Sequence, residues 1–146
     1  MQRTIRTPDG RMLAVKESGD PGGRPVLVHM GTPNSRHLYG PVAANAAALG
    51  LRLISYDRPG YGGSTPQPGR SVADCAMDTR AICEAFGISK TAMWGISGGG
   101  PHVLACAALL PGLVTAAACL AHLPPILPTG STTSPAWAKK TSTTPG

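Results

Sequence analysis

Hydrophobic residues along the chain fall into short runs that are separated by glycine and proline. Consecutive apolar positions are typical of strands buried on both faces of a sheet. Such a run covers residues 25–29, and further strands are expected at 51–56, 91–94 and 113–121. Two further strands are expected at residues 4–6 and 11–17, because the intervening Pro8-Asp9-Gly10 contains Asp-Gly, a strong signal for a tight hairpin turn.

Three segments between these strands have helical patterns, at residues 39–49, 71–87 and 101–110. In the second, Ser71 and Asp74 have the spacing of an N-terminal capping box, and Gly87 provides a stop. Small and apolar residues then recur at helical spacing and form one stripe. The stripe consists of Val72, Cys75, Ala76, Thr79, Ile82, Cys83 and Phe86. Asp78 and Arg80 lie off it.

The alternation of strands and helices after an opening hairpin predicts an α/β fold with a mostly parallel sheet flanked by helices. The length of 146 residues suits one domain, and a hydrophobic content of 42% is enough to form a core. No internal repeat is visible.

The segment Gly95-Ile96-Ser97-Gly98-Gly99 has the pattern G-x-S-x-G, with an apolar strand before it and a helix after it. This is the context of a nucleophile elbow, in which a strained turn lifts the serine to the carboxyl end of a strand. Gly95 and Gly99 would allow the close packing of strand against helix. Ser97 is therefore the candidate nucleophile. The alternatives are a structural turn with a capping serine and a phosphate-binding loop.

Acyl transfer builds negative charge on an oxygen, which hydrogen-bond donors must stabilise. One donor is expected to be the N–H of Gly98, which follows the nucleophile, and the other should come from the loop after the strand at 25–29. We select the N–H of Thr32, because Pro33 has none, and Met30 is the alternative. An ordinary turn is the competing interpretation of this loop.

Three separated motifs are similar to those of the α/β-hydrolase superfamily, in particular bacterial serine hydrolases. They are H-x-G-T-P at 29–33, Y-D-R-P-G-Y-G-G-S at 56–64 and G-I-S-G-G-G-P-H at 95–102. The resemblance covers about residues 4–121. The family more often has glycine directly after the histidine, whereas Met30 intervenes here. In the family the middle loop is structural, so Asp57 is not assigned a catalytic role.

The resemblance implies an α/β-hydrolase fold of eight strands, a Ser-acid-His triad in that chain order, no cofactor and a small ester- or amide-like substrate. Epoxide opening and dehalogenation usually place aspartate at the elbow, so Ser97 argues against them. The triad acid and base should follow the sixth strand, but after Leu120 only His122 occurs and no carboxylate. We expect structural or surface roles for the other histidines, at 29, 37 and 102.

Residues 1–121 are therefore interpreted as the N-terminal part of an α/β-hydrolase domain, truncated after about the sixth strand and weakly active or inactive. The sixth strand would then be an exposed edge. A non-catalytic binding module and a fragment complemented by a second chain are the alternatives. Residues 122–146 form an irregular Thr/Ser/Pro-rich tail without acids. It could be natural, an expression or annotation scar, or the product of a shifted reading frame starting near His122. In that frame the junction Trp137-Ala138 must encode glycine.

The formal charge is +6, but the basic residues are scattered singly apart from Lys139-Lys140, which argues against nucleic-acid binding. The four cysteines lack metal-site spacing and are expected to be small buried side chains in a reducing cytosol, so no metal is predicted. No apolar run reaches the length of a membrane-spanning helix, and the N-terminus lacks the apolar region of a signal peptide. A cytoplasmic protein without membrane contact is expected, and its oligomeric state stays open.

Overall fold

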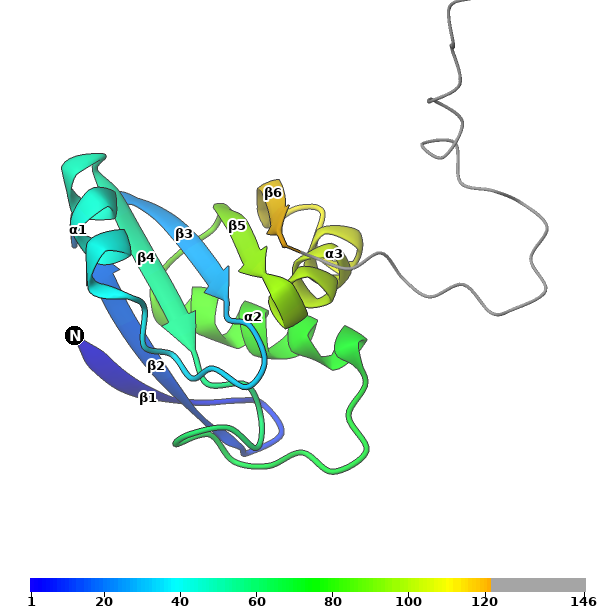
Figure 1. The fold of residues 1–146 in the computed structure, drawn as a ribbon. Coiled ribbons are helices and arrows are strands. Elements are labelled where there is room, and N and C mark those ends of the chain that lie inside the picture. Colours follow the sequence, from blue (N-terminus) through cyan, green and yellow to red (C-terminus); the bar gives the residue numbers. More distant parts are fainter. Residues whose placement is uncertain (122–146) are drawn as a thin grey trace, which may run out of the picture.

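The computed structural model describes residues 1–121, which form one six-stranded sheet with helices on both faces (Figure 1). The strands are β1 (Gln2–Arg6), β2 (Met12–Gly19), β3 (Arg24–His29), β4 (Leu51–Tyr56), β5 (Thr91–Ile96) and β6 (Val114–Leu120). The helices are α1 (Gly40–Ala48), α2 (Cys75–Ala85) and α3 (Gly100–Leu109), with short 3-10 turns η1 (Val72–Asp74) and η2 (Ser97–Gly99). Each predicted strand and helix is present.

The strands are ordered β1-β2-β4-β3-β5-β6 across the sheet. β2 is antiparallel to both of its neighbours, whereas the neighbours from β4 to β6 are parallel. The mostly parallel sheet predicted from the sequence is therefore confirmed. At the centre, β3 pairs with β5 in a register that places His29 beside Gly95. This pairing brings the loop after β3 next to the predicted elbow.

The helices divide between the two faces of the sheet. α1 packs on β2 and β4, while α2 and α3 contact each other on the opposite face (Figure 1). The core under α2 and α3 includes Leu27, Ile54 and Met93 from the central strands, and the smaller core under α1 includes Val28 and Leu53. Neighbouring residues of one strand thus enter different cores, as expected for a strand buried on both faces.

The capping box predicted before the second helix is present, but the helix opens with a 3-10 turn. Asp74 Oδ2 accepts the Ser71 N–H at 2.6 Å, and α2 proper begins at Cys75. At the other end, Gly87 has a φ of 65°, in the left-handed region that favours glycine after a helix.

Asp78 is buried, with 1% of its surface exposed, although it lies off the apolar stripe of α2. Its Oδ1 accepts a hydrogen bond from Arg11 Nη2 at 2.6 Å, and Arg11 also donates to Asp9 at 2.7 Å. An ion pair thus joins the opening hairpin to α2. The helical stripe alone does not predict this, because the partner lies 67 residues earlier in the chain.

β6 is the last strand of the sheet in the described part of the chain, and most of its residues are exposed. The edge position expected for this strand is thus what the structure shows. Cys75, Cys83 and Cys106 are buried and Cys119 is half-buried, all as free thiols. None of the helices within residues 1–121 is long and apolar enough to cross a bilayer. The predictions for the tail at 122–146 lie outside the described residues.

Candidate active site

Ser97 lies at a sharp change of direction between β5 and α3. β5 ends at Ile96, Ser97 has a φ of 49°, and η2 leads directly into α3. A non-glycine residue in the left-handed region is uncommon and marks a strained position. The serine side chain is exposed at the carboxyl end of the strand. This is the backbone arrangement that the G-x-S-x-G pattern predicts.

The two outer glycines of this turn have no room for a side chain. A Cβ on Gly95 would lie 2.5 Å from the Gly99 carbonyl oxygen. A Cβ on Gly99 would overlap the His29 carbonyl oxygen and lie 2.7 Å from its carbon. Both obstacles are backbone atoms, which cannot rotate away as a flexible side chain could. The turn can therefore pack against β3 only with glycine at these positions.

The loop after β3 lies against the elbow. A Cβ on Gly98 would lie 3.2 Å from the Thr32 backbone nitrogen, and one on Gly31 would lie 3.5 Å from Ser97 Cβ. Thr32 is exposed, and its N–H donates to no acceptor among residues 1–121. Ser97, Gly98 and Thr32, which the sequence analysis selected together, are thus neighbours in space.

Arg58 connects these two loops, and the sequence analysis missed it. The residue follows β4 and is only 3% exposed. Its Nη1 donates to Met30 O at 2.9 Å and to Gly98 O at 3.2 Å, while Nη2 donates to Thr32 Oγ1 at 2.9 Å. The signal that could have found it is an arginine two residues after a buried strand, inside a motif that we interpreted only as a structural loop.

Asp57, the neighbour of Arg58, is fully buried, and both of its carboxylate oxygens accept hydrogen bonds. Its Oδ1 accepts the Arg36 N–H at 2.6 Å, and its Oδ2 accepts the Gly63 N–H at 2.8 Å and pairs with the Arg36 guanidinium. The carboxylate therefore ties the loop after β4 to the segment that follows the Thr32 loop. These bonds agree with the structural role expected for Asp57.

Two of the histidines lie in the interior beside the elbow. His29 is fully buried at the end of β3, 3.7 Å from Cys106 Sγ, and its ring meets that of Tyr56 edge-on. His102 is 7% exposed, and its Nδ1 lies 2.9 Å from Gly98 O, so this nitrogen carries the proton. Burial, assisted by the charge of Arg58, lowers the pKa of His102 to about 4. Neutral His102 therefore supports the backbone of the elbow.

The low pKa of His102 predicts a specific pH dependence of stability. In the unfolded chain the imidazole takes up a proton near pH 6.5, whereas the folded form resists it down to about pH 4. The free energy of unfolding should therefore fall by about 2 kcal/mol as the pH drops through this interval. Urea titrations from pH 7 to pH 4 would measure the fall.

His102→Asn is the matched variant for this experiment, because its amide can still donate to Gly98 O but does not titrate. We expect a shallower loss of stability in the variant than in the wild type between pH 6.5 and pH 4. Parallel curves for the two proteins would contradict the assignment.

Ser97 has no proton acceptor within the described part of the chain. Among residues 1–121, no histidine or carboxylate hydrogen-bonds to its hydroxyl. The same residues contain no group of three metal-ligating side chains suited to an ion. His122 lies outside the described residues.

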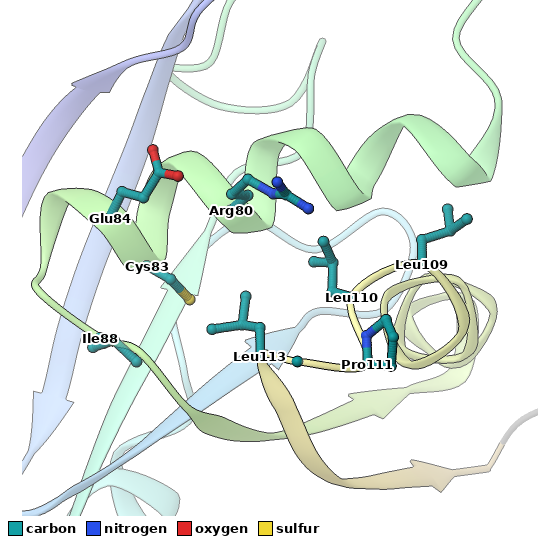
Figure 2. A pocket seen from close by; sticks show the side chains of 9 residues that line it. Arg80, Cys83, Glu84, Ile88, Leu109, Leu110, Pro111 and Leu113 are labelled. Atoms are coloured by element: carbon teal, nitrogen blue, oxygen red, sulfur yellow. The ribbon is translucent and has the colours of Figure 1, made fainter.

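A pocket of about 340 Å³ opens between α2 and the turn that leads from α3 to β6 (Figure 2). Leu109, Leu110 and Leu113 line it together with Arg80 and Cys83. Because α3 begins at the elbow and the pocket lies at its other end, this cavity is separate from the region around Ser97.

The chain belongs to the α/β hydrolase fold family, whose model matches residues 24–143. A curated relative, a non-heme chloroperoxidase from Streptomyces lividans, is 32% identical over 126 residues. That alignment covers 85% of this chain but 46% of the relative, so the chain spans about half of the relative's length.

Solved structures agree with this membership. An α/β hydrolase fold protein from Nakamurella multipartita is 33% identical with a TM-score of 0.73, and the match covers 84% of this chain and 41% of that one. An esterase from Thermogutta terrifontis is 25% identical with a TM-score of 0.74, covering 88% of this chain and 48% of that one. The predicted fold, an α/β-hydrolase fold represented by its first six strands, is thus confirmed.

Proposed function

We propose that Ser97 is the nucleophile of a serine hydrolase that cleaves an ester- or amide-like bond of a small molecule through an acyl-enzyme. The observation that carries the proposal is the left-handed backbone of Ser97 between β5 and α3. A serine hydroxyl in this position is presented at the carboxyl edge of the sheet. The esterase among the similar structures supports this class of substrate.

The N–H groups of Gly98 and Thr32 would bind the oxyanion in this reaction. They belong to residues that are packed against each other, and the Thr32 N–H has no other acceptor among residues 1–121. Donors that are already held in place stabilise the charge that develops in the transition state without further reorganisation. Met30 is the alternative donor, and the exposed position of Thr32 beside the elbow favours the Thr32 N–H.

Because residues 1–121 offer Ser97 no base, we expect this chain to be a weak catalyst. A serine hydroxyl without a base to accept its proton is a poor nucleophile, and only the oxyanion donors and substrate binding then contribute. We expect ester hydrolysis at least about 10⁴-fold slower than in hydrolases with an intact triad. No cofactor takes part in the proposed reaction.

A fluorophosphonate probe with intact-mass and peptide-level readout tests the nucleophile. Slow labelling of the chain at Ser97 is expected, and Ser97→Ala should abolish it. Ser18→Ala, which removes a serine from β2 far from the elbow, is the matched control and should be labelled as the wild type is.

Each other outcome of this labelling experiment has a defined meaning. Labelling that persists in Ser97→Ala would contradict the nucleophile assignment. Fast, stoichiometric labelling of the wild type would contradict the weak activity. Labelling that requires a second chain would favour a fragment that is complemented, the alternative to a self-sufficient enzyme.

A further inference from the structure

Arg58 donates hydrogen bonds to both of the loops that carry the proposed oxyanion donors, Gly98 and Thr32. Its guanidinium bonds to Met30 O and Thr32 Oγ1 in the loop after β3, and to Gly98 O in the elbow after β5. A guanidinium is planar and its N–H groups have fixed directions. One rigid group therefore sets the separation of two loops that belong to different strands.

The charge of Arg58 has no carboxylate partner within residues 1–121. The four ion pairs described there involve Arg11, Arg36 and Arg52, and the adjacent Asp57 is paired with Arg36. Among residues 1–121, the guanidinium contacts neutral oxygen atoms, the His102 ring nitrogen at 3.5 Å and the face of Tyr61 at 5.1 Å. A cation buried in this way costs several kcal/mol unless opposite charge compensates it.

Negative charge on the reacting oxygen would arise next to Gly98 and Thr32. We propose that Arg58 is the positioning residue of this site: it fixes the Gly98 and Thr32 donors relative to each other and places an uncompensated positive charge behind them. This inference rests on the proposed function of Ser97, and it goes beyond it by naming the group that orders the oxyanion hole. Because this charge is already in place, it favours the transition state, in which negative charge develops, more than the ground state.

His102 fits the same arrangement. Its Nδ1–H donates to the Gly98 carbonyl that Arg58 also contacts, and the two side-chain nitrogens are 3.5 Å apart. Both side chains donate to the same carbonyl oxygen. At this distance the positive charge of Arg58 would repel a second positive charge on His102. The buried ring stays neutral, and Arg58 remains the single formal charge behind the two donors.

The test compares Arg58→Met and Arg58→Lys with the wild type in the full 146-residue chain. The rate of Ser97 phosphonylation is measured over a range of fluorophosphonate concentrations. Arg58→Met should lower the maximal rate by up to about 100-fold, the effect of a misplacement of about 1 Å. The half-saturating probe concentration should not change. Arg58→Lys keeps the charge but cannot bridge both loops, so it should recover only part of the rate.

Arg52→Met is the matched control. Arg52 lies at the opposite end of β4, is half-buried and pairs with Glu17, so this change removes an arginine and its ion pair away from the elbow. Its labelling rate should stay within about twofold of the wild type. If Arg58→Met matches this control, or changes only the half-saturating concentration, the positioning role is wrong.

Amide hydrogen exchange gives a second readout that does not depend on reactivity. In Arg58→Met the Asn34 amide, which donates to Gly31 O in the loop after β3, and the Gly100 amide, which donates to Ser97 O in the elbow, should exchange faster, while amides in the middle of β4 stay protected as in the wild type. Unchanged exchange at Asn34 and Gly100 would also overturn the proposal. If the wild type is not labelled at Ser97, the nucleophile assignment fails, and the exchange data still decide whether Arg58 orders the two loops.

Discussion

Gly99→Ala is expected to lower the free energy of unfolding by about 3 kcal/mol or more, the upper end of the range for overpacked positions. The added methyl group would overlap the His29 carbonyl oxygen and lie 3.0 Å from that of Met30. Both belong to the backbone at the end of β3, which is hydrogen-bonded to β4 on one side and to β5 on the other. β3 cannot move without breaking one of these pairings.

Urea denaturation followed by far-UV circular dichroism measures this loss. Gly40→Ala is the matched control: Gly40 begins α1, and a Cβ there would meet nothing within 4 Å. The control should be as stable as the wild type or slightly more stable, because alanine favours a helix. Equal stabilities for the two variants would show that the elbow can open around a methyl group, against the packing described here.

Asp78→Asn is expected to destabilise the protein by about 3 kcal/mol, because it removes one partner of a buried ion pair. Arg11, only 8% exposed, would keep Asp9 but lose its charged partner on α2. Burial raises the pKa of Asp78 even though Arg11 opposes this effect. Desolvation of the carboxylate thus outweighs its attraction to the arginine.

The same denaturation experiment can test whether the ion pair between Arg11 and Asp78 is stabilising overall. Replacing both partners, as in Arg11→Met with Asp78→Leu, should recover most of the stability lost in Asp78→Asn, because no buried charge is left alone. Glu84→Gln, an exposed change on the same helix, serves as the control and should be nearly neutral. A double variant that is less stable than Asp78→Asn would show that the ion pair is itself strongly stabilising.

The order of strands and helices could be predicted from the sequence because it depends on local signals. The apolar run at 25–29 became β3, Asp9-Gly10 turned the opening hairpin, and Gly87 ended α2. The elbow was predictable for the same reason, since its strand, turn and helix are contiguous in the chain. The 3-10 turns at the starts of α2 and α3 are small departures that such patterns do not distinguish from helix.

Contacts between distant residues could not be predicted in this way. Asp78 lies off the apolar stripe of its own helix, and its burial is explained by the ion pair with Arg11. Arg58 lies 40 residues before Gly98, and its position after a buried strand marks it as a candidate without indicating which loops its guanidinium reaches. Periodicity describes one element at a time, whereas these side chains derive their roles from the way elements meet.

The order β4-β3-β5 in the middle of the sheet determines at which edge of the sheet a ligand can bind. After β3 the chain leaves toward the face covered by α1, and after β5 it leaves toward the face covered by α3. The two exits diverge, and in open α/β sheets ligands bind at the carboxyl edge where this happens. Connectivity alone thus selects the location, and we propose that Ser97, Thr32 and Arg58 supply the chemistry there. Substitution of these three side chains would change that chemistry without altering the strand order that places it.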